Sequence, residues 1–481
     1  MSWNVWSILS IVNYASVLVA IEHIIRRRRE PRGSLAWILA LLLLPGVGLI
    51  LFLLIGQVPI QRKVRRRLRR RRLIEPSLAK QTDDVVRRFD ALDFAELEPS
   101  QKSLMRLATR MGEAVVTRGN EVVVYHDAER VFLAMGLAIE AAKSHVHMEY
   151  YILQADETGR AVGDLLMRKA RDGVEVRLLL DAVGCWRLPR SYVRQLQRAG
   201  VKVAFFLPWG MTGRRFNLNC RNHRKLVMVD GRVGFTGSQN IGDEYLGRRR
   251  RYGPWRDTHL RIRGPAAVQL QEIFVEDWHF ATREDLASAT YFPEPAMEGS
   301  HLVQLVASGP DRRPDVMLQL LYAAVSDARG SIALMTPYFV PDRAMLLALQ
   351  SASHRGVRVR LLLPSRSDHW FVLWAGRSFY EELLEAGVEV FEYGKGMLHS
   401  KVVVVDRRWA MVGSANMDER SFRLNFELTA LLYDAELAQG LAADIEVLQS
   451  RASRIGLQDV RGWSYRQSLA AGAARLATPL L

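Results

Sequence analysis

Two octets of the chain each place a histidine and a lysine two residues apart at the head of an apolar run that ends in aspartate. They are HRKLVMVD at 223–230 and HSKVVVVD at 399–406. Side chains of a strand alternate between its two faces, so His399 and Lys401 point the same way. One such octet could simply be a core strand with polar ends. Two copies indicate a shared chemical use.

The agreement between the copies continues beyond the octets, as GSQN at 237–240 and GSAN at 413–416. In both copies the serine lies 15 and the asparagine 17 residues after the histidine. A chance match of four polar identities at fixed spacing is improbable. The candidate site residues are therefore His223, Lys225, Ser238 and Asn240 in the first copy and His399, Lys401, Ser414 and Asn416 in the second.

These residue types suit the chemistry of a phosphodiester. Such a substrate is anionic, so an enzyme needs a nucleophile, positive charge at the non-bridging oxygens and a proton donor for the leaving alkoxide. One neutral imidazole can attack phosphorus and be held as a phosphohistidine while the other protonates the leaving group. Two lysines and two asparagine amides can hold the oxygens. Since the sequence has no compact His, Asp and Glu cluster at metal-ligand spacing, we expect neither a metal nor another cofactor.

A histidine nucleophile also needs an acceptor that anchors its second ring nitrogen. Asp230 and Asp406, which end the octets, lie seven residues from their histidines. That is roughly 23 Å along an extended strand, so we predict a structural role for them. Asp257 and Glu427 occupy matching places in two later predicted strands, 34 and 28 residues after the histidine of their own copy. We expect these two acids to orient the imidazoles, the alternative being that they are ordinary strand residues.

The elements that must position these residues repeat as well. DGVEVRLLLD (172–181) recurs as RGVRVRLLLP (355–364), and AGVKVAFF (199–206) recurs as AGVEVFEY (386–393). Three matched blocks in the same order indicate a duplicated unit. Apolar strands alternating with helical stretches predict an α/β fold of two duplicated α/β/α lobes with mixed sheets. The chemistry favours a shared interface at which the two histidines meet.

The N-terminal part of the chain has a different composition. The net charge is +16 over 481 residues, and residues 1–75 carry +11 of it, from fourteen Lys and Arg against three Glu. Two apolar runs lie there, at 3–25 and 35–56, each long enough to span a membrane. A cleaved signal peptide is the alternative for the first run, but it lacks a basic leading region and a second apolar run follows. We therefore predict an N-terminal pair of membrane helices.

The membrane topology is open at the level of the sequence. Basic clusters lie both between the two runs, around 26–32, and after the second, at 62–72, and both would prefer the cytoplasm. Pro45, Gly46 and Gly48 would allow a broken second element that returns to the side it left. The larger cluster favours catalytic lobes on the cytoplasmic face of the membrane, whereas a full second crossing would put them outside.

Composition bounds the remaining possibilities. At 49% hydrophobic and 25% charged residues the chain is globular, and its two cysteines, Cys185 and Cys220, exclude a disulfide framework and fit a reducing compartment. The charge outside the first 75 residues is thin for a nucleic-acid groove. The predicted domains are a membrane hairpin at 1–60, a basic juxtamembrane segment and linker at 61–104, a first lobe at 105–290, a second lobe at 300–445 and a C-terminal tail at 446–481.

The two H-x-K-x4-D motifs, each followed by G-S-x-N, resemble the phospholipase D superfamily, and the chain is most similar to its bacterial cardiolipin synthase branch. The resemblance covers nearly the whole chain. The stretches that carry it are EPRGSLAWILALLLLPGVGLILFLLIG, MEYYIL, RNHRKLVMVDGRVGFTGSQNIGDEY, GPWRDTHLRIRGPA, PYFVPD, GVRVRLLLPSRSDH, MLHSKVVVVD, VGSANMDERSFRLNFE and ARLATPLL.

This resemblance implies metal-independent phosphatidyl transfer. One phosphatidylglycerol gives its phosphatidyl group to a histidine, glycerol leaves, and a second phosphatidylglycerol attacks to give cardiolipin. By carry-over the core residues are those of the two motifs, with Asp257 and Glu427 orienting the imidazoles. His223 is expected to be the nucleophile and His399 the acid and then the base. The expected partners are anionic phospholipids and the membrane, with no nucleic acid and a possible homo-oligomer.

Two features of the sequence and three competing functions stay open. The arginines at 248–251 depart from the family pattern, either as solvated surface or as a contact to lipid headgroups, and Cys220 is expected to be a packing residue. Water could attack the same phosphohistidine, which would make the protein a hydrolytic phospholipase D. The chain could also be a membrane-tethered nuclease, or an inactive binding protein that keeps the fold.

Overall fold

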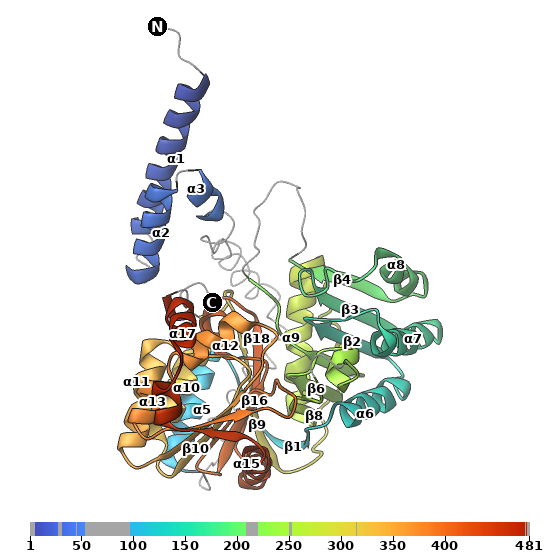
Figure 1. Ribbon diagram of the computed structural model, residues 1–481. Helices are drawn as coiled ribbons and strands as arrows, with labels where there is room; N and C mark the ends of the chain where they lie inside the picture. The colour runs from blue at the N-terminus through green and yellow to red at the C-terminus, as the bar shows by residue number, and fades with distance from the viewer. Residues whose placement is uncertain are drawn as a thin grey trace. The chain divides into compact units, whose positions relative to one another are not determined.

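The computed structural model describes residues 5–26, 31–44, 46–52, 97–207, 220–249, 253–313, 315–476 and 478 (Figure 1). The chain forms two compact units. The smaller comprises residues 1–65 with 209–220, and the main body comprises 66–208 with 221–481.

In the smaller unit the first apolar run forms α1 (Val5–Arg26), and the second forms α2 (Pro31–Leu43) and α3 (Val47–Leu51). Gly46, between α2 and α3, has a φ of 87°, a left-handed conformation that interrupts a helix and that glycine adopts without strain. The second run is therefore interrupted between α2 and α3, an arrangement that the sequence allows, although Pro45 itself lies outside the described residues.

Apolar contacts hold these helices together, through a small cluster made of Val17, Ala20, Ile24, Leu41 and Phe52. Two membrane-crossing helices are predicted here from the sequence. Within the described ranges, no helix is both long enough and apolar enough to cross a membrane. The basic run at 62–72 lies outside the described residues.

The main body is built on one mixed sheet of fifteen strands, whose order repeats outward from its middle. One half runs β1-β8-β6-β5-β2-β3-β4, and the other runs β9-β18-β16-β15-β10-β12-β13 with β19 at its edge. The bounds in the first half are β1 (Val116–Tyr125), β2 (His145–Tyr150), β3 (Glu175–Asp181), β4 (Lys202–Phe206), β5 (Leu226–Val229), β6 (Val233–Gly237) and β8 (His259–Arg263). In the second half they are β9 (His301–Ser308), β10 (Ser331–Met335), β12 (Arg358–Pro364), β13 (Glu389–Tyr393), β15 (Val402–Val405), β16 (Trp409–Gly413), β18 (Glu427–Leu432) and β19 (Ser453–Ile455).

Strand directions repeat together with strand order. β2, β3 and β4 are parallel, as are β10, β12 and β13. The motif strands β5 and β15 run antiparallel to β2 and β10. The sheet is therefore mixed in both halves, in agreement with the α/β prediction.

The two halves share this sheet through β1. Its first residues, 116–120, pair with β9, and its last, 121–125, pair with β8. The register shifts between Thr117 and Asn120, where Gly119 has a φ of 86°. The sequence predicted a separate sheet in each lobe. The structure has one sheet instead, because the single long strand β1 passes from one half to the other.

Helices cover both faces of each half (Figure 1). In the first half α6 and α7 pack on the opposite face of the strands from the long helix α9. In the second half α15 packs on one face and α10 and α11 on the other. The bounds are α5 (Pro99–Gly112), α6 (Ala128–Glu140), α7 (Glu157–Arg171), α8 (Arg190–Arg198), α9 (Pro265–Thr282), α10 (Val316–Asp327), α11 (Arg343–His354), α12 (Trp370–Arg377), α13 (Tyr380–Glu385), α14 (Glu419–Arg423), α15 (Ala435–Gln449), α16 (Leu457–Arg461) and α17 (Tyr465–Leu476).

Candidate active site

The two motifs enter the sheet at equivalent places. Lys225 directly precedes β5 and Lys401 directly precedes β15. Because β5 and β15 are antiparallel to their neighbours, the motif histidines lie at the edge of the sheet where the parallel strands end. Both histidines and both lysines are buried.

Backbone hydrogen bonds cross between the halves at this edge. The His223 N–H donates to the carbonyl of Phe426 at 2.9 Å, and the His399 N–H donates to the carbonyl of Arg256 at 2.8 Å. The second contact continues the short parallel pairing of β7 (Trp255–Arg256) with β14 (Met397–Leu398). Each acceptor immediately precedes a predicted orienting acid. The backbone thus brings each histidine to the acid of the other half.

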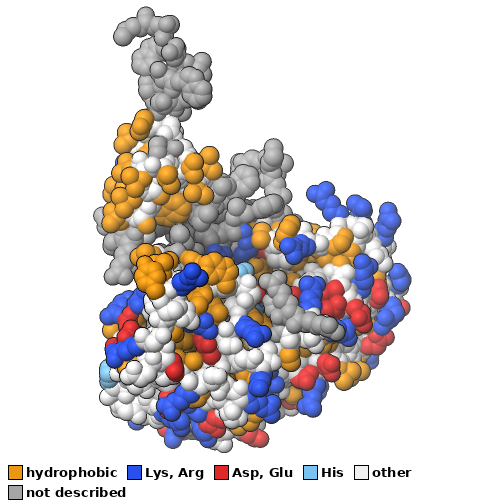
Figure 2. Space-filling view, in the orientation of Figure 1, with side chains coloured by type: hydrophobic (Ala, Val, Ile, Leu, Met, Phe, Trp, Pro, Cys, Tyr) orange, Lys and Arg blue, Asp and Glu red, His pale blue; other side chains and the backbone are white. Residues whose placement is uncertain are grey.

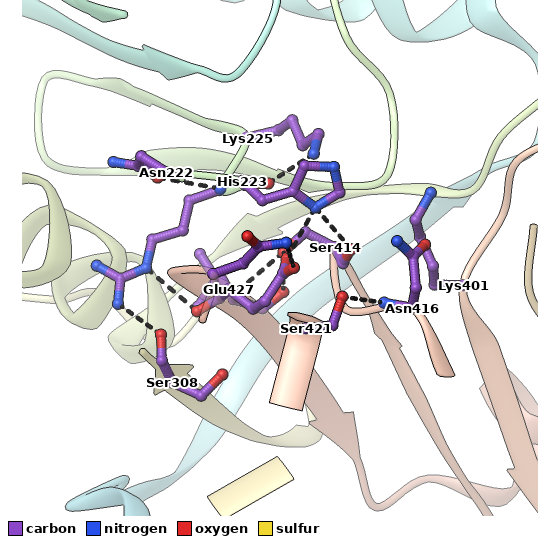
Figure 3. A network of polar contacts seen from close by, with 12 residues as sticks. Asn222, His223, Lys225, Ser308, Lys401, Ser414, Asn416, Ser421 and Glu427 are labelled. Atoms are coloured by element: carbon purple, nitrogen blue, oxygen red, sulfur yellow. Dashed lines mark hydrogen bonds and ion pairs between the residues drawn. The ribbon is translucent and has the colours of Figure 1, made fainter. Parts of the chain in front are cut away.

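The side chains pair in the same crossed way. Nδ1 of His223 lies 3.0 Å from Oε2 of Glu427 (Figure 3), and Nδ1 of His399 lies 2.9 Å from Oδ1 of Asp257. The sequence places Asp257 and Glu427 at matching strand positions, with their spacing counted from the histidine of the same copy. The structure pairs each acid with the histidine of the other copy. Since a carboxylate only accepts, Nδ1 carries the proton and Nε2 keeps its lone pair.

Burial and charge set the ionisation of both pairs. Burial lowers the pKa of His223 to about 4, with Glu427 opposing the shift, and burial together with Lys401 lowers the pKa of His399. Burial alone would raise the pKa of Glu427 and of Asp257, but the facing histidines and lysines hold both below their ordinary values. Near neutral pH the centre therefore holds two neutral imidazoles, each beside an ionised carboxylate.

The two lysines fold back onto their own motifs. Each ammonium donates to the carbonyl of the histidine two residues earlier, at 2.6 Å in both copies. Lys401 Nζ also lies 2.9 Å from Nε2 of His399. Burial lowers the pKa of Lys401 to about 8 and that of Lys225 well below its ordinary value. An incoming phosphate would supply the anionic partner that both ammonium groups need.

The motif serines and asparagines are buried beside these pairs. Ser238 Oγ donates to the Thr258 carbonyl at 3.0 Å, whereas Ser414 Oγ donates to the Glu427 carboxylate that anchors His223. Asn240 Oδ1 accepts the Ile152 N–H at 3.2 Å, while Asn416 Oδ1 has no hydrogen-bond partner among the described residues.

Two polar residues beside the lysines were not predicted from the sequence. In the strand pairings His259 lies opposite Gly237, and Thr429 lies opposite Gly413. A Cβ on either glycine would come within 2.7 Å of the facing His259 or Thr429 side chain. The glycine of each GS-x-N motif therefore makes room for a polar side chain. When WRDTHLRI (255–262) is aligned with NFELTALL (425–432), His259 and Thr429 occupy the same position. The sequence could therefore have pointed to both residues.

Aromatic rings also line the histidines. The Tyr151 ring lies 4.9 Å from the His223 ring, and the Trp255 ring lies 5.4 Å from the His399 ring. Trp255 Nε1 additionally donates to Asp257 Oδ2 at 2.8 Å. The aromatic walls strengthen the burial that keeps the imidazoles neutral.

A buried ion pair lies at the first motif, and the equivalent position of the second motif holds a serine. The Arg224 guanidinium, which is fully buried, pairs with Asp277 of α9 and donates through Nε to the Glu427 carbonyl at 3.1 Å. At the equivalent position Ser400 only donates to the Arg256 carbonyl at 3.4 Å and accepts from Thr258 Oγ1 at 3.0 Å. This asymmetry was not predicted.

The aspartates that end the octets are distant from the imidazoles and bind backbone. Asp230 accepts the N–H groups of residues 143, 144 and 145 at 2.8–2.9 Å, and Asp406 accepts those of residues 329, 330 and 331 at 2.6–3.0 Å. Both have a positive φ, 51° and 53°. They thus tie the end of each motif strand to the start of the neighbouring strand.

The arginine quartet at 248–251 and Cys220 were both singled out in the sequence. Of the arginines at 248–251, Arg248 and Arg249 are described. Arg248 pairs with Glu157 at 3.1 Å, and Arg249 donates to Gln154 Oε1 at 2.8 Å. Cys220 is buried, as is Cys185.

Doubled H-x-K motifs, crossed histidine–acid pairs and a repeated mixed sheet together define a phospholipase D-like protein. Residues 137–278 and 321–448 match the family described as "Cardiolipin synthase, PLD-like domain", and residues 3–57 match "Phospholipase D-nuclease N-terminal". The chain belongs to the cardiolipin synthase family.

Individual relatives agree with this assignment. The chain is 41% identical to a cardiolipin synthase of Geobacillus kaustophilus, over 98% of this chain and 94% of that protein. It is 39% identical to cardiolipin synthase 2 of Bacillus anthracis, over 94% and 88%. Among solved structures, phosphatidylserine synthase of Haemophilus influenzae shares the fold with a TM-score of 0.61, at 14% identity, over 79% of this chain and all of that one.

Proposed function

We propose that this enzyme joins two phosphatidylglycerol molecules into cardiolipin and glycerol through a phosphohistidine. The observation that carries the proposal is the pair of crossed, buried histidine–carboxylate contacts at the head of two matched motifs. Membership of the cardiolipin synthase family supplies the substrate class, phospholipids.

The surroundings of Nε2 support His223 as the nucleophile. The lone pair of His399 Nε2 faces the Lys401 ammonium at 2.9 Å, whereas Nε2 of His223 accepts no hydrogen bond from any residue the structure describes. In the first step Nε2 of His223 attacks phosphorus, and the bond from phosphorus to the glycerol oxygen breaks. Lys225, Lys401 and the two asparagine amides hold the non-bridging oxygens.

His399 completes both steps as a proton carrier. Its pKa is lowered by burial and by Lys401, and an anionic phosphodiester bound between the lysines offsets both effects, so the imidazole takes up a proton as substrate enters. That proton goes to the departing glycerol oxygen. His399 then removes a proton from a hydroxyl of the second phosphatidylglycerol, whose oxygen attacks phosphorus and breaks the bond to His223.

The proposal extends to membrane association through the N-terminal unit. Its helices expose large apolar side chains, including Leu18, Leu43 and Ile50. The basic run at 62–72 would attract anionic lipids, at about 1 kcal/mol per residue near the surface. We place the catalytic lobes, residues 105–290 and 300–445, at the cytoplasmic face of the bacterial inner membrane.

A product assay with the full chain tests this function. Reconstituted enzyme is supplied with phosphatidylglycerol labelled in its acyl chains and in its glycerol headgroup. We expect one glycerol released for each cardiolipin formed. Phosphatidic acid without cardiolipin would show hydrolysis instead and would refute the transferase assignment.

A further inference from the structure

Two exposed tryptophans occupy equivalent places in the two halves of the main body. Trp186 follows β3 and is 69% exposed, and Trp370 follows β12 and is 66% exposed. β3 and β12 hold the same place in the repeated strand order. Trp186 lies in the loop after β3, and Trp370 is the first residue of α12, after β12. Both therefore follow the carboxyl ends of matched strands, at the edge of the sheet that carries the motif histidines. Tryptophan is enriched at membrane–water interfaces, so its exposure in both halves fits contact with a lipid surface.

The loop of Trp186 is packed directly against the His223 side of the site. Asp181, at the end of β3, accepts the N–H of Asn222, the residue before His223, at 2.8 Å. Gly184 lies so close to the Tyr151 carbonyl that a Cβ there would be 2.0 Å from the oxygen, and the Tyr151 ring covers His223. Trp186 is two residues further along this fixed turn.

The loop of Trp370 borders the His399 side in a similar way. Asp368 accepts a hydrogen bond from Tyr338 at 2.7 Å, and its charge acts on both His399 and Lys401. Trp370 then begins α12 and contacts Phe371, with ring centroids 5.6 Å apart. Hydrophobic side chains gather on the surface over α12 and α17 (Figure 2), where Tyr465 and Leu469 are also exposed.

Charge around the tryptophans fits an anionic surface. Residues 182–198 contain four arginines and no Asp or Glu, and all four arginines are exposed. The Arg187 guanidinium lies 4.9 Å from the centre of the Trp186 ring. Arg366, four residues before Trp370, is exposed as well. Tryptophan and arginine together favour the headgroup layer of an anionic bilayer, where the indole is half buried and the guanidinium meets phosphate.

We propose that Trp186 and Trp370, with the arginines beside them, form a two-sided rim that docks the active site onto the surface of an anionic phospholipid bilayer. This inference rests on the proposed function, since the substrate it brings to the site is a lipid. The catalytic histidines are buried below the rim, so the phosphodiester of a bilayer lipid reaches them only when the rim touches the headgroup layer. The duplication provides one anchor on each side of the entrance.

The test compares substrate in a bilayer with substrate in solution. The full chain with Trp186→Ala and Trp370→Ala together is assayed on phosphatidylglycerol in phosphatidylcholine vesicles and on short-chain phosphatidylglycerol kept below its micelle-forming concentration. We expect kcat/KM on vesicles to fall about tenfold, equivalent to about 1.4 kcal/mol, and activity on the soluble lipid to stay within about twofold. Equal losses on both substrates, or none, would overturn the docking role.

Matched controls separate docking from folding and from self-association. Leu133→Ala with Leu347→Ala removes two exposed apolar side chains, 64% and 48% exposed, from helices α6 and α11, and should change neither activity. Trp186→Phe with Trp370→Phe keeps apolar contact and should restore most vesicle activity. A change in oligomeric state of the alanine variant in detergent would instead identify the rim as an interface between copies and would refute membrane docking.

A binding measurement stands apart from the reaction. Vesicles containing brominated phosphatidylglycerol quench tryptophans that enter the headgroup layer. The quenched fraction should be smaller in the double alanine variant than in the unmodified chain, whichever product the enzyme makes. Equal quenching in the two proteins would refute the docking rim, even if the enzyme makes cardiolipin. If quenching differs between them but no cardiolipin forms, only the proposed function is refuted.

Discussion

His223 and His399 hold equivalent positions in a repeated structure, yet their surroundings differ. His223 is anchored by Glu427, whose carbonyl is held by the buried Arg224, and Nε2 of His223 has no hydrogen-bond partner among the described residues. His399 is anchored by Asp257, has Ser400 where the first copy has Arg224, and has an ammonium against its Nε2. The surroundings of His223 fix an imidazole whose Nε2 lone pair is available for attack. The surroundings of His399 hold an imidazole whose pKa should respond to a bound anion. Duplication thus supplies two similar side chains that can take different roles.

The largest effect expected from this difference is on the covalent intermediate. His223→Ala should lower turnover by roughly 10⁴-fold or more and remove the phosphoenzyme, because the attacking nitrogen is lost. His399→Ala should lower turnover by roughly 10²–10⁴-fold and still form some phosphoenzyme, because only the proton carrier is lost. Trapping with lipid labelled at phosphorus distinguishes the two. A phosphoenzyme that persists in His223→Ala and disappears in His399→Ala would show that His399 is the nucleophile and His223 the proton carrier.

Next in size is the effect of the crossed anchors. Glu427→Gln and Asp257→Asn should each lower kcat by roughly 10²–10⁴-fold with the fold intact, because each imidazole loses the acceptor that fixes its tautomer. Single-turnover kinetics should show slow phosphoenzyme formation with Glu427→Gln, since that acid anchors His223. Circular dichroism checks the fold. Full activity in either variant would contradict the anchoring role of that acid.

The same two acids should move the pH profile differently, because Glu427 acts on both of its limbs and Asp257 acts on the alkaline limb. With the His223 pKa at about 4 and the Lys401 pKa at about 8, kcat/KM should fall below pH 4, as the nucleophile is protonated, and above pH 8, as the ammonium loses its charge. Glu427 raises the pKa of His223 and of Lys401, so Glu427→Gln should shift both the acidic and the alkaline limb to lower pH. Asp257 raises the pKa of Lys401, so Asp257→Asn should shift the alkaline limb to lower pH. Shifts in the reverse direction would contradict these contacts.

A smaller contrast concerns stability. Arg224→Ala leaves Asp277 buried without the guanidinium and should lower the free energy of unfolding by about 3–5 kcal/mol. Ser400→Ala, at the equivalent position, should lower it by only about 1–2 kcal/mol, because two hydrogen bonds between uncharged groups are lost. Urea unfolding of the detergent-solubilised chain measures both. Equal losses of unfolding free energy in the two variants would contradict the expected difference between the two motifs.

The smallest effects are expected where the two halves agree. Asp230→Asn and Asp406→Asn should each destabilise the fold by about 1–3 kcal/mol, since each carboxylate accepts three backbone N–H groups. Turnover measured well below the unfolding temperature should change little. A large loss of kcat with unchanged stability in either variant would give that aspartate a part in the chemistry.

Much of this arrangement was predictable because it is local or repeated. Octet spacing identified both histidines and both lysines, and repetition of the strand blocks indicated a duplicated α/β unit. The crossed anchors were not predictable, because strand periodicity does not reveal which distant strand pairs with which. The contact between β7 and β14 joins residues about 140 positions apart. Arg224 and Asp277 were missed for the same reason, since one lies within a motif and the other on a helix with no visible link to it.

The crossed contacts also bear on assembly. A lobe that folds by itself has a histidine without its carboxylate partner and a carboxylate without its histidine partner. Neither histidine–carboxylate pair is complete within one lobe. Activity therefore arises only when both lobes are folded against each other. Under the proposed function, a nascent chain therefore has no anchored nucleophile until its second lobe has folded.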